Sequence, residues 1–212
     1  MASLALPRDT TPYMDYPPIL LASRSPRRAE LLQRLGFNYM QVASQADERT
    51  IAERAPWTEY AMSTARAKLR GIRSLPPCSE KGNILLAADT VVELEGRVLH
   101  RPHTPDDAHA LLEALSGRWH MVTTGVALAY RGIERSFASQ TRVEFARLNA
   151  RDIDYYIRGR APFDKAGGYG IQDWLGLAWV ARIEGSYTNV LGLPTEPLLR
   201  AVEQLLADGQ AG

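Results

Sequence analysis

The segment from Ser23 to Arg28 has the residue types of a phosphate-binding loop. It reads SRSPRR, so hydroxyls and arginines stand side by side between a short apolar run and leucines at helical spacing. The pattern predicts a loop that joins a strand end to a helix N-terminus. Helix N-termini present free N–H groups and partial positive charge, and guanidinium groups match phosphate oxygens. The segment therefore predicts an anion site, although a solvated loop whose arginines pair with nearby acids explains it as well.

A second chemical signal is a carboxylate inside an apolar run. Residues 83–94 are predicted to form a strand, which is interrupted by the polar residues Asp89 and Thr90. A carboxylate is costly to bury without a charged partner or a metal ion. Aspartates at strand ends are common catalytic or metal-binding groups. Taken alone, Asp89 is explained more simply by hydrogen bonding to a turn.

Two glycine-containing segments complete the candidate site. Residues 163–172 read FDKAGGYGIQ, in which the glycines allow close backbone approach to a ligand, Lys165 adds a cation and Gln172 adds an amide for a base edge. Residues 183–194 read IEGSYTNVLGLP, and their backbone donors before a helix would suit an anion. The first segment matches neither a P-loop nor a dinucleotide fingerprint. Taken singly, a wide turn explains the first, and helix capping plus a loop explains the second.

Alternating strands and helices must position these segments. Strands are predicted at residues 19–23, 83–94, 97–99, 120–130, 134–147 and 177–183, and helices at 26–35, 57–72, 105–117, 150–159 and 194–207. Because helices and strands interleave, the fold class is α/β (α+β) with a mixed sheet. Residues 1–16 are predicted to be a flexible arm, and residues 17–212 a single domain.

The composition excludes several classes of protein. The chain has 212 residues and a formal net charge of +1, from 25 Lys plus Arg against 24 Asp plus Glu. This balance argues against a protein whose main partner is nucleic acid. The single cysteine, Cys78, excludes an internal disulfide and a multi-cysteine zinc site. Neither a secretory signal nor a long apolar run is found, so we expect a cytoplasmic protein with no membrane partner.

The order of these motifs resembles that of the Maf-like nucleoside triphosphate pyrophosphatases, over residues 19–207. The motifs that carry the resemblance are SRSPRR, the acidic pair Asp47 and Glu48, Lys68, AADT, DKAGGYGIQ and IEGSYTNVLGLP. The GYGIQ form resembles the subgroup that acts on dTTP and UTP rather than the subgroup associated with 7-methyl-GTP. The sequence departs from the family pattern at Arg101, where a lysine is usual, and at Asp173, where a glycine is usual.

The resemblance implies both a fold and a reaction. The fold is a mixed twisted sheet flanked by helices, with two lobes around a central cleft, as in Maf and inosine triphosphatase proteins. The reaction is hydrolysis of a nucleoside triphosphate at the α-phosphorus to the monophosphate and pyrophosphate. dTTP, UTP and modified pyrimidine nucleotides are the implied substrates, which would make this a housecleaning enzyme. A homodimer stays open, since relatives are commonly dimers.

The resemblance also assigns roles to individual residues. Asp89 would be the general base that orients the attacking water, and with Glu48 it would hold Mg²⁺ or Mn²⁺. Arg27, Thr90 and Gln172 would tune substrate choice, because the Gln172 amide suits the O4 and N3–H edge of uracil or thymine. The further phosphate-binding positions are Ser23, Ser25, Arg28, Lys68, Arg101 and Lys165.

Three other functions stay open at this stage. A nucleotide-binding regulator of septum formation would keep the pocket without turnover, and release of pyrophosphate separates it from an enzyme. A nucleic-acid-binding module would use the basic loop, and its binding would depend steeply on salt. A phosphomonoesterase would release single phosphates instead of pyrophosphate.

Overall fold

The computed structural model describes residues 11–44, 46, 57–76, 78, 82–159 and 162–211. Its strands are β1 (Ile19–Leu21), β2 (Tyr39–Gln41), β3 (Ile84–Leu94), β4 (Arg97–Leu99), β5 (Trp119–Tyr130), β6 (Ile133–Phe145) and β7 (Val180–Glu184). They form one seven-stranded sheet in the order β2-β1-β3-β5-β6-β7, with β4 paired to β3 outside that path. β1 is parallel to β2 and β3, and the pairs β3–β5, β5–β6 and β6–β7 are antiparallel. The predicted mixed sheet is confirmed.

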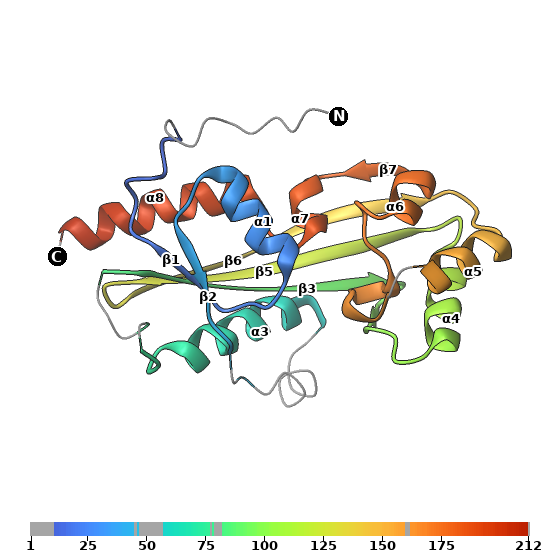
Figure 1. The fold of residues 1–212 in the computed structure, drawn as a ribbon, viewed down its shortest axis with the longest axis horizontal. Coiled ribbons are helices and arrows are strands. Elements are labelled where there is room, and N and C mark those ends of the chain that lie inside the picture. The colour runs from blue at the N-terminus through green and yellow to red at the C-terminus, as the bar shows by residue number, and fades with distance from the viewer. Residues whose placement is uncertain are drawn as a thin grey trace.

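Helices cover both faces of this sheet. The α-helices are α1 (Pro26–Leu35), α3 (Trp57–Ile72), α4 (Pro105–Leu115), α5 (Ala150–Gly159), α6 (Trp174–Trp179), α7 (Tyr187–Leu191) and α8 (Thr195–Ala211), and the short 3-10 helices are η1 (Pro162–Asp164) and η2 (Ala166–Gly168). α1 and α8 lie on one face, and α3 lies on the other, while α4, α5 and α6 gather at one end of the long strands (Figure 1).

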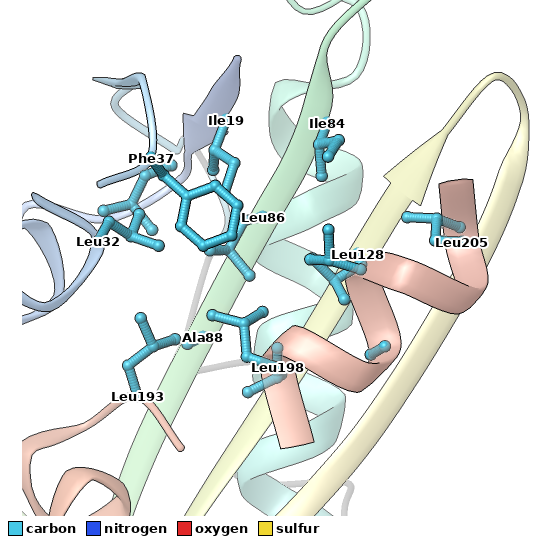
Figure 2. Close-up of a cluster of buried hydrophobic side chains, with 14 of the residues drawn as sticks. Ile19, Leu32, Phe37, Ile84, Leu86, Ala88, Leu128, Leu193, Leu198 and Leu205 are labelled. Atoms are coloured by element: carbon cyan, nitrogen blue, oxygen red, sulfur yellow. The ribbon is translucent and has the colours of Figure 1, made fainter. Parts of the chain in front are cut away.

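In the first lobe, the sheet lies between two helical layers. Successive residues of a strand point to opposite faces, so Leu86 and Ala88 of β3 join the core under α1 and α8 (Figure 2), whereas Leu85 and Ala87 join the core under α3. α3 packs tightly enough that a Cβ added at Gly125 of β5 would lie 2.3 Å from the α3 backbone. Glycine at this position therefore allows the helix to lie directly on the strand.

The second lobe is built on the far halves of the same strands. Val92 of β3, Val122 of β5 and Phe145 of β6 form a separate core with residues of α4, α5, α6 and η2. The local sequence favours the start of α4. Thr104 is its N-cap, and Thr104 and Asp107 form a reciprocal capping box. Shared strands thus carry two lobes with distinct cores, as the resemblance implied.

One predicted strand is partly wrong. Residues 177–183 were expected to be extended, but residues up to Trp179 belong to α6, and the strand β7 begins only at Val180. The Leu177 N–H donates to the Asp173 carbonyl at 2.9 Å, which closes the first turn of this helix. Short apolar runs do not distinguish helix from strand by their periodicity, which explains the error.

The described part of the predicted arm contacts the first lobe. The ring of Tyr13 stacks on Phe37 with centroids 5.0 Å apart, and Tyr16 meets the same ring edge-on at 6.2 Å. Both tyrosines pack against the core under α1 and α8. Residues 1–10 lie outside the described residues, and the flexibility of the arm stays a prediction.

Candidate active site

A cleft lies beside a stretch of β3 that has no strand partner on one side. β1 pairs with residues 84–86 of β3, and β4 pairs with residues 92–94. Within the described chain, residues 87–91 between them have a ladder partner only in β5. The chain leaves β1 at this gap and enters the loop before α1. The result is a cleft of about 320 Å³, whose lining includes Thr90 of β3 and Lys68 of α3.

Residues from both lobes line this cleft. One wall comes from the SRSPRR segment, residues 23–28, which forms the loop after β1 and the start of α1. Ser44, Lys68 and Thr90 lie beside it. The opposite wall comes from Arg101 and from the glycine-rich FDKAGGYGIQ segment, residues 163–172. Residues of α7 close the end of the cleft. The full lining is Ala22, Ser23, Arg24, Ser25, Pro26, Arg27, Arg28, Ser44, Lys68, Thr90, Val92, Arg101, Val122, Asp164, Lys165, Ala166, Tyr169, Gly170, Ile171, Gln172, Val190, Leu191 and Gly192.

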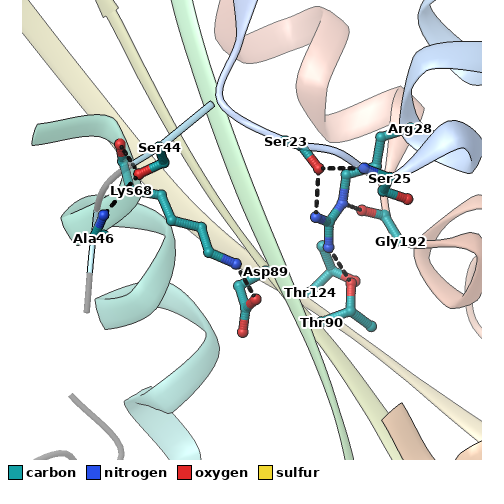
Figure 3. Close-up of polar contacts among 10 residues, drawn as sticks. All are labelled: Ser23, Ser25, Arg28, Ser44, Ala46, Lys68, Asp89, Thr90, Thr124 and Gly192. Atoms are coloured by element: carbon teal, nitrogen blue, oxygen red, sulfur yellow. Dashed lines mark hydrogen bonds and ion pairs between the residues drawn. The ribbon is translucent and has the colours of Figure 1, made fainter. Parts of the chain in front are cut away.

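Arg28 connects the wall of the cleft to three other segments. Its Nε donates to the Gly192 carbonyl at 2.8 Å, one terminal nitrogen donates to Ser23 Oγ at 3.1 Å, and the other donates to Thr90 Oγ1 at 3.0 Å (Figure 3). Only 8% of the residue is exposed. These bonds make Arg28 part of the frame of the cleft, and its predicted phosphate contact stays a prediction.

A chain of hydroxyls that begins at Thr90 supports Arg28 from behind. Thr90 Oγ1 lies 2.9 Å from Thr124 Oγ1, and the Thr124 hydroxyl donates to the Asn189 carbonyl at 2.9 Å. A hydroxyl has one proton to donate, so Thr90 must be the donor to Thr124. The Asn189 amide in turn donates to Thr141 Oγ1 at 2.9 Å. The IEGSYTNVLGLP segment therefore holds the cleft together as well as capping a short helix.

Asp89 lies on the opposite face of β3 from Thr90, as its neighbour in a strand must. Its Oδ1 accepts from Lys68 Nζ at 2.7 Å, and both side chains are over 90% buried (Figure 3). Ser44 Oγ donates to the Lys68 carbonyl at 3.1 Å, which ties α3 to the segment after β2. Lys68 lines the cleft, whereas Asp89 stands directly behind it. The predicted base is therefore held by a cation that faces the ligand space.

A second group of charges spans the mouth of the cleft. Arg27 on α1 lies 3.5 Å from Asp164 Oδ2, and Lys165 Nζ lies 2.6 Å from Asp164 Oδ1. Partial burial alone would raise the pKa of Asp164. The hydrogen bond from Lys165 and the charges of Lys165 and Arg27 outweigh it and lower that pKa below its ordinary value. This carboxylate therefore links the two lobes as an anion.

A buried phenol anchors the loop behind Lys165. The Tyr156 hydroxyl donates to Asp173 Oδ2 at 2.9 Å and accepts from the Gly170 N–H at 3.3 Å. Burial, followed by the charge of Asp173, raises the pKa of Tyr156, so it stays a neutral donor. Asp173 Oδ2 also lies 3.5 Å from Lys165 Nζ. Asp173, which stands where the family pattern usually has a glycine, thus holds both the loop backbone and Lys165 in place.

The lining of the cleft also contains an unpaired acceptor at Gln172. Gln172 lines the cleft, and its Oε1 atom is buried with no hydrogen-bond partner among the described residues. Three residues earlier, the Tyr169 hydroxyl lies 2.6 Å from His120 Nε2. Burial lowers the pKa of His120 to about 4, so the imidazole is neutral near pH 7. A bound ligand can therefore supply a donor to Gln172 Oε1. The contact between Tyr169 and His120 holds the loop that carries Gln172 in place.

The structure brings most of the predicted site residues to this one cleft. Those that line it are Ser23, Ser25, Arg27, Arg28, Lys68, Thr90, Arg101, Lys165 and Gln172. Asp89 stands behind Lys68, whereas Asp47 and Glu48 lie outside the described residues. The sequence reasoning missed the role of Asp164 across the cleft, the anchor at Tyr156, and the buried Thr124 and Asn189. The acid next to Lys165 in the sequence was a signal for the first of these.

The donor set suits a metal ion that arrives with phosphates. Among the described residues, no group of three or more His, Cys, Asp or Glu side chains could hold an ion by itself. Mg²⁺ usually takes only one or two protein carboxylates and completes its shell with water and substrate phosphates. Asp89 is the predicted carboxylate ligand among the described residues, and Lys68 Nζ already contacts its Oδ1.

Comparisons with known proteins show which family this chain resembles. Residues 18–205 match the family model described as Maf-like protein. A dTTP/UTP pyrophosphatase of Phocaeicola vulgatus is 43% identical over 187 residues, which is 88% of this chain and 95% of the relative. One of Chlorobium luteolum is 41% identical over 193 residues, covering 91% of this chain and all of the relative. The Staphylococcus aureus Ham1 structure matches 61% of this chain and 72% of its own, at 14% identity and a TM-score of 0.40.

Proposed function

Because the chain belongs to the Maf-like protein family, we propose that it hydrolyses dTTP and UTP to the nucleoside monophosphate and pyrophosphate. The observation that carries the proposal is the cleft, where cations from both lobes stand with the unpaired amide oxygen of Gln172. Relatives named dTTP/UTP pyrophosphatase that align with most of the chain support it. Modified pyrimidine triphosphates fit the same chemistry.

The phosphate chain would lie between Arg27 and Lys165. Both line the cleft, and Arg101 adds a third cation there. α1 has ten residues and begins directly after Ser25, whose side chain makes no capping bond to the helix. Its first N–H groups therefore suit an anion, together with the guanidinium groups nearby. Neutralising the triphosphate in this way stabilises both the bound substrate and the charge that develops on the leaving pyrophosphate.

Gln172 would read the base. Its buried Oε1 suits the N3–H donor of uracil or thymine, and the NH₂ group of the same amide suits the O4 acceptor. Cytosine presents an acceptor at N3 and a donor at N4, so an amide held in this orientation would face two mismatches. Sites built to hydrogen-bond a ligand reject analogues that leave those groups unpaired.

Asp89 would orient the attacking water and accept its proton. The water oxygen forms a new bond to the α-phosphorus as the bond to the bridging oxygen breaks, and that oxygen leaves with pyrophosphate. Lys68 holds the carboxylate in one position through its 2.7 Å contact. Mg²⁺ or Mn²⁺, held by Asp89 and Glu48, would neutralise the phosphate oxygens. Asp89 acts mainly by positioning, since aspartate is a weak base.

A panel of nucleoside triphosphates tests this function. With Mg²⁺ or Mn²⁺ present, we expect dTTP and UTP to be hydrolysed fastest, each giving one pyrophosphate and one monophosphate. Release of single phosphates would instead identify a phosphomonoesterase. Tight binding with no pyrophosphate release would support a regulator of septum formation, an alternative that the pyrophosphatase names of the relatives do not favour.

We also propose a cytoplasmic location, with no nucleic-acid or membrane partner, and leave a homodimer open. None of the helices in the described ranges is both long enough and apolar enough to span a bilayer. Gel filtration at several protein concentrations measures the oligomeric state.

A further inference from the structure

Asp164 stands between two cations that face the ligand space. Its two carboxylate oxygens lie 3.5 Å from an Arg27 nitrogen and 2.6 Å from Lys165 Nζ. Arg27 belongs to α1 of the first lobe, whereas Asp164 and Lys165 belong to the segment that packs with the second lobe. The carboxylate therefore bridges the cleft, at a place where a phosphate group would find the same two partners.

The exposure of these side chains shows which group is easiest to displace. Asp164 is 56% exposed, whereas Arg27 is 23% and Lys165 is 11% exposed. The carboxylate thus stands at the mouth of the cleft, in front of the cations. Asp173 on the other side of Lys165 is only 14% exposed and is held by the Tyr156 hydroxyl. Of the two acids beside Lys165, Asp164 is the one that can move aside.

We propose that Asp164 is an internal competitor for the phosphate-binding cations, whose carboxylate must leave Arg27 and Lys165 before a phosphate chain can bind them. The inference rests on the proposed function, since it takes the ligand of the cleft to be a phosphate chain. Asp164 therefore weakens the binding of substrate and of pyrophosphate alike. It favours product release, because the carboxylate returns to the cations as pyrophosphate departs.

The Asp164→Asn variant removes the competing charge and keeps the size of the side chain. Exposed ion pairs contribute up to about 1 kcal/mol, so we expect the KM for UTP to fall about twofold to fivefold at low salt. The inhibition constant of pyrophosphate should fall by a similar factor, without an increase in kcat. Because salt screens exposed charges, the difference from the wild type should shrink as the salt concentration rises.

Two further variants serve as controls. Asp164→Glu restores the carboxylate and should return both constants toward the wild-type values. Asp208→Asn removes a surface aspartate that also pairs with an arginine, Arg135, at comparable exposure. Asp208 lies near the C-terminal end of α8, at the opposite end of the molecule from α5 (Figure 1). This variant should leave KM and the inhibition constant unchanged.

Calorimetry with inorganic pyrophosphate tests the inference without turnover. We expect Asp164→Asn to bind pyrophosphate more tightly than the wild type, even if no triphosphate proves to be a substrate. A failure of the proposed function is therefore distinguishable from a failure of this inference. Weaker or equal pyrophosphate binding by Asp164→Asn, or a raised KM, would overturn it and make Asp164 a residue that positions Lys165. Absence of pyrophosphate binding to both proteins would also overturn it.

Discussion

Two of the aspartate–cation pairs at the cleft, Lys68–Asp89 and Arg27–Asp164, differ in their burial and in their separation. Lys68 and Asp89 are 9% and 8% exposed and lie 2.7 Å apart, whereas Arg27 and Asp164 are 23% and 56% exposed and lie 3.5 Å apart. Removing one partner of a buried pair leaves a buried charge and costs about 3–5 kcal/mol. An exposed pair contributes about 1 kcal/mol or less. The buried pair can thus fix a reacting group, and the exposed pair can exchange with a ligand.

The uncharged side chains of the cleft also divide into those bonded within the protein and those left for a ligand. Tyr156 and His120 are buried, make hydrogen bonds within the protein and hold the glycine-rich loop from behind. Gln172 on that loop has a buried oxygen for which the described residues offer no partner. A buried acceptor without a partner is unfavourable until a ligand supplies the donor. The cleft therefore combines fixed supports with groups reserved for the ligand.

Breaking the buried pair should have the largest effect. Asp89→Asn should reduce turnover of UTP by about 100-fold or more, since positioned general bases contribute factors of 10² to 10⁴. It should also lower the free energy of unfolding, because the buried ammonium of Lys68 loses the charge of Asp89 at 2.7 Å. Pyrophosphate release and urea unfolding measure the two effects.

A double variant separates the two consequences. Asp89→Asn with Lys68→Met removes both charges, so stability should recover while turnover stays lost. Near-normal turnover by Asp89→Asn would contradict the assignment of Asp89 as the base. Full recovery of turnover in the double variant would contradict it too.

The pH dependence of stability should report the buried imidazole. His120 has a pKa of about 4 in the folded protein and an ordinary value of 6.5 when unfolded. The unfolded chain therefore binds this proton first as the pH falls below 6.5, and stability declines until about pH 4. The shift corresponds to roughly 3 kcal/mol. Urea unfolding between pH 7 and pH 4 should show this decline, and His120→Gln should flatten it; an equal slope in both proteins would rule out this cause.

Removing the exposed cation should affect binding more than stability. We expect Arg27→Ala to lower kcat/KM for UTP about tenfold or more, because charge-assisted hydrogen bonds contribute about 1.5–3 kcal/mol. Its free energy of unfolding should change by about 1 kcal/mol or less, since the pair with Asp164 is exposed. An unchanged kcat/KM would remove Arg27 from the phosphate site, and a large loss of stability would contradict the contrast between the two pairs.

Truncating the amide of Gln172 should have the smallest effect on the rate. Gln172→Ala should reduce the preference for UTP over CTP by about tenfold, since the two lost hydrogen bonds to the base together correspond to about 1–2 kcal/mol. Turnover of UTP itself should fall less, because the phosphate contacts remain. Competition assays with both nucleotides measure the ratio. If the ranking of substrates stays the same, Gln172 does not read the base.

Local signals in the sequence predicted much of the fold. The helices predicted at residues 26–35 and 57–72 are confirmed with the same bounds as α1 and α3. The error at residues 177–183 came from an apolar run that fits a helix and a strand equally well. β2 and α7 were not predicted, because β2 is an edge strand of three residues that are not buried, and α7 is a five-residue helix within a segment rich in loop-forming residues.

The partners of the site residues could not be predicted in this way. Motif order pointed to the residues that line the cleft, but Arg28 bonds to Gly192, which lies 164 residues further along the chain, and to Thr90, 62 residues away. Such contacts depend on how the sheet brings distant segments together. For the same reason, the bridge from Arg27 to Asp164 became visible only in the folded structure.

Hydrolysis of UTP in ¹⁸O-labelled water tests the central claim most directly. If the cleft directs water to the α-phosphorus, the label should appear in UMP, and pyrophosphate should be released unlabelled. Mass spectrometry of the two products after a single turnover gives the answer. Label in pyrophosphate, or release of inorganic phosphate in its place, would contradict the account.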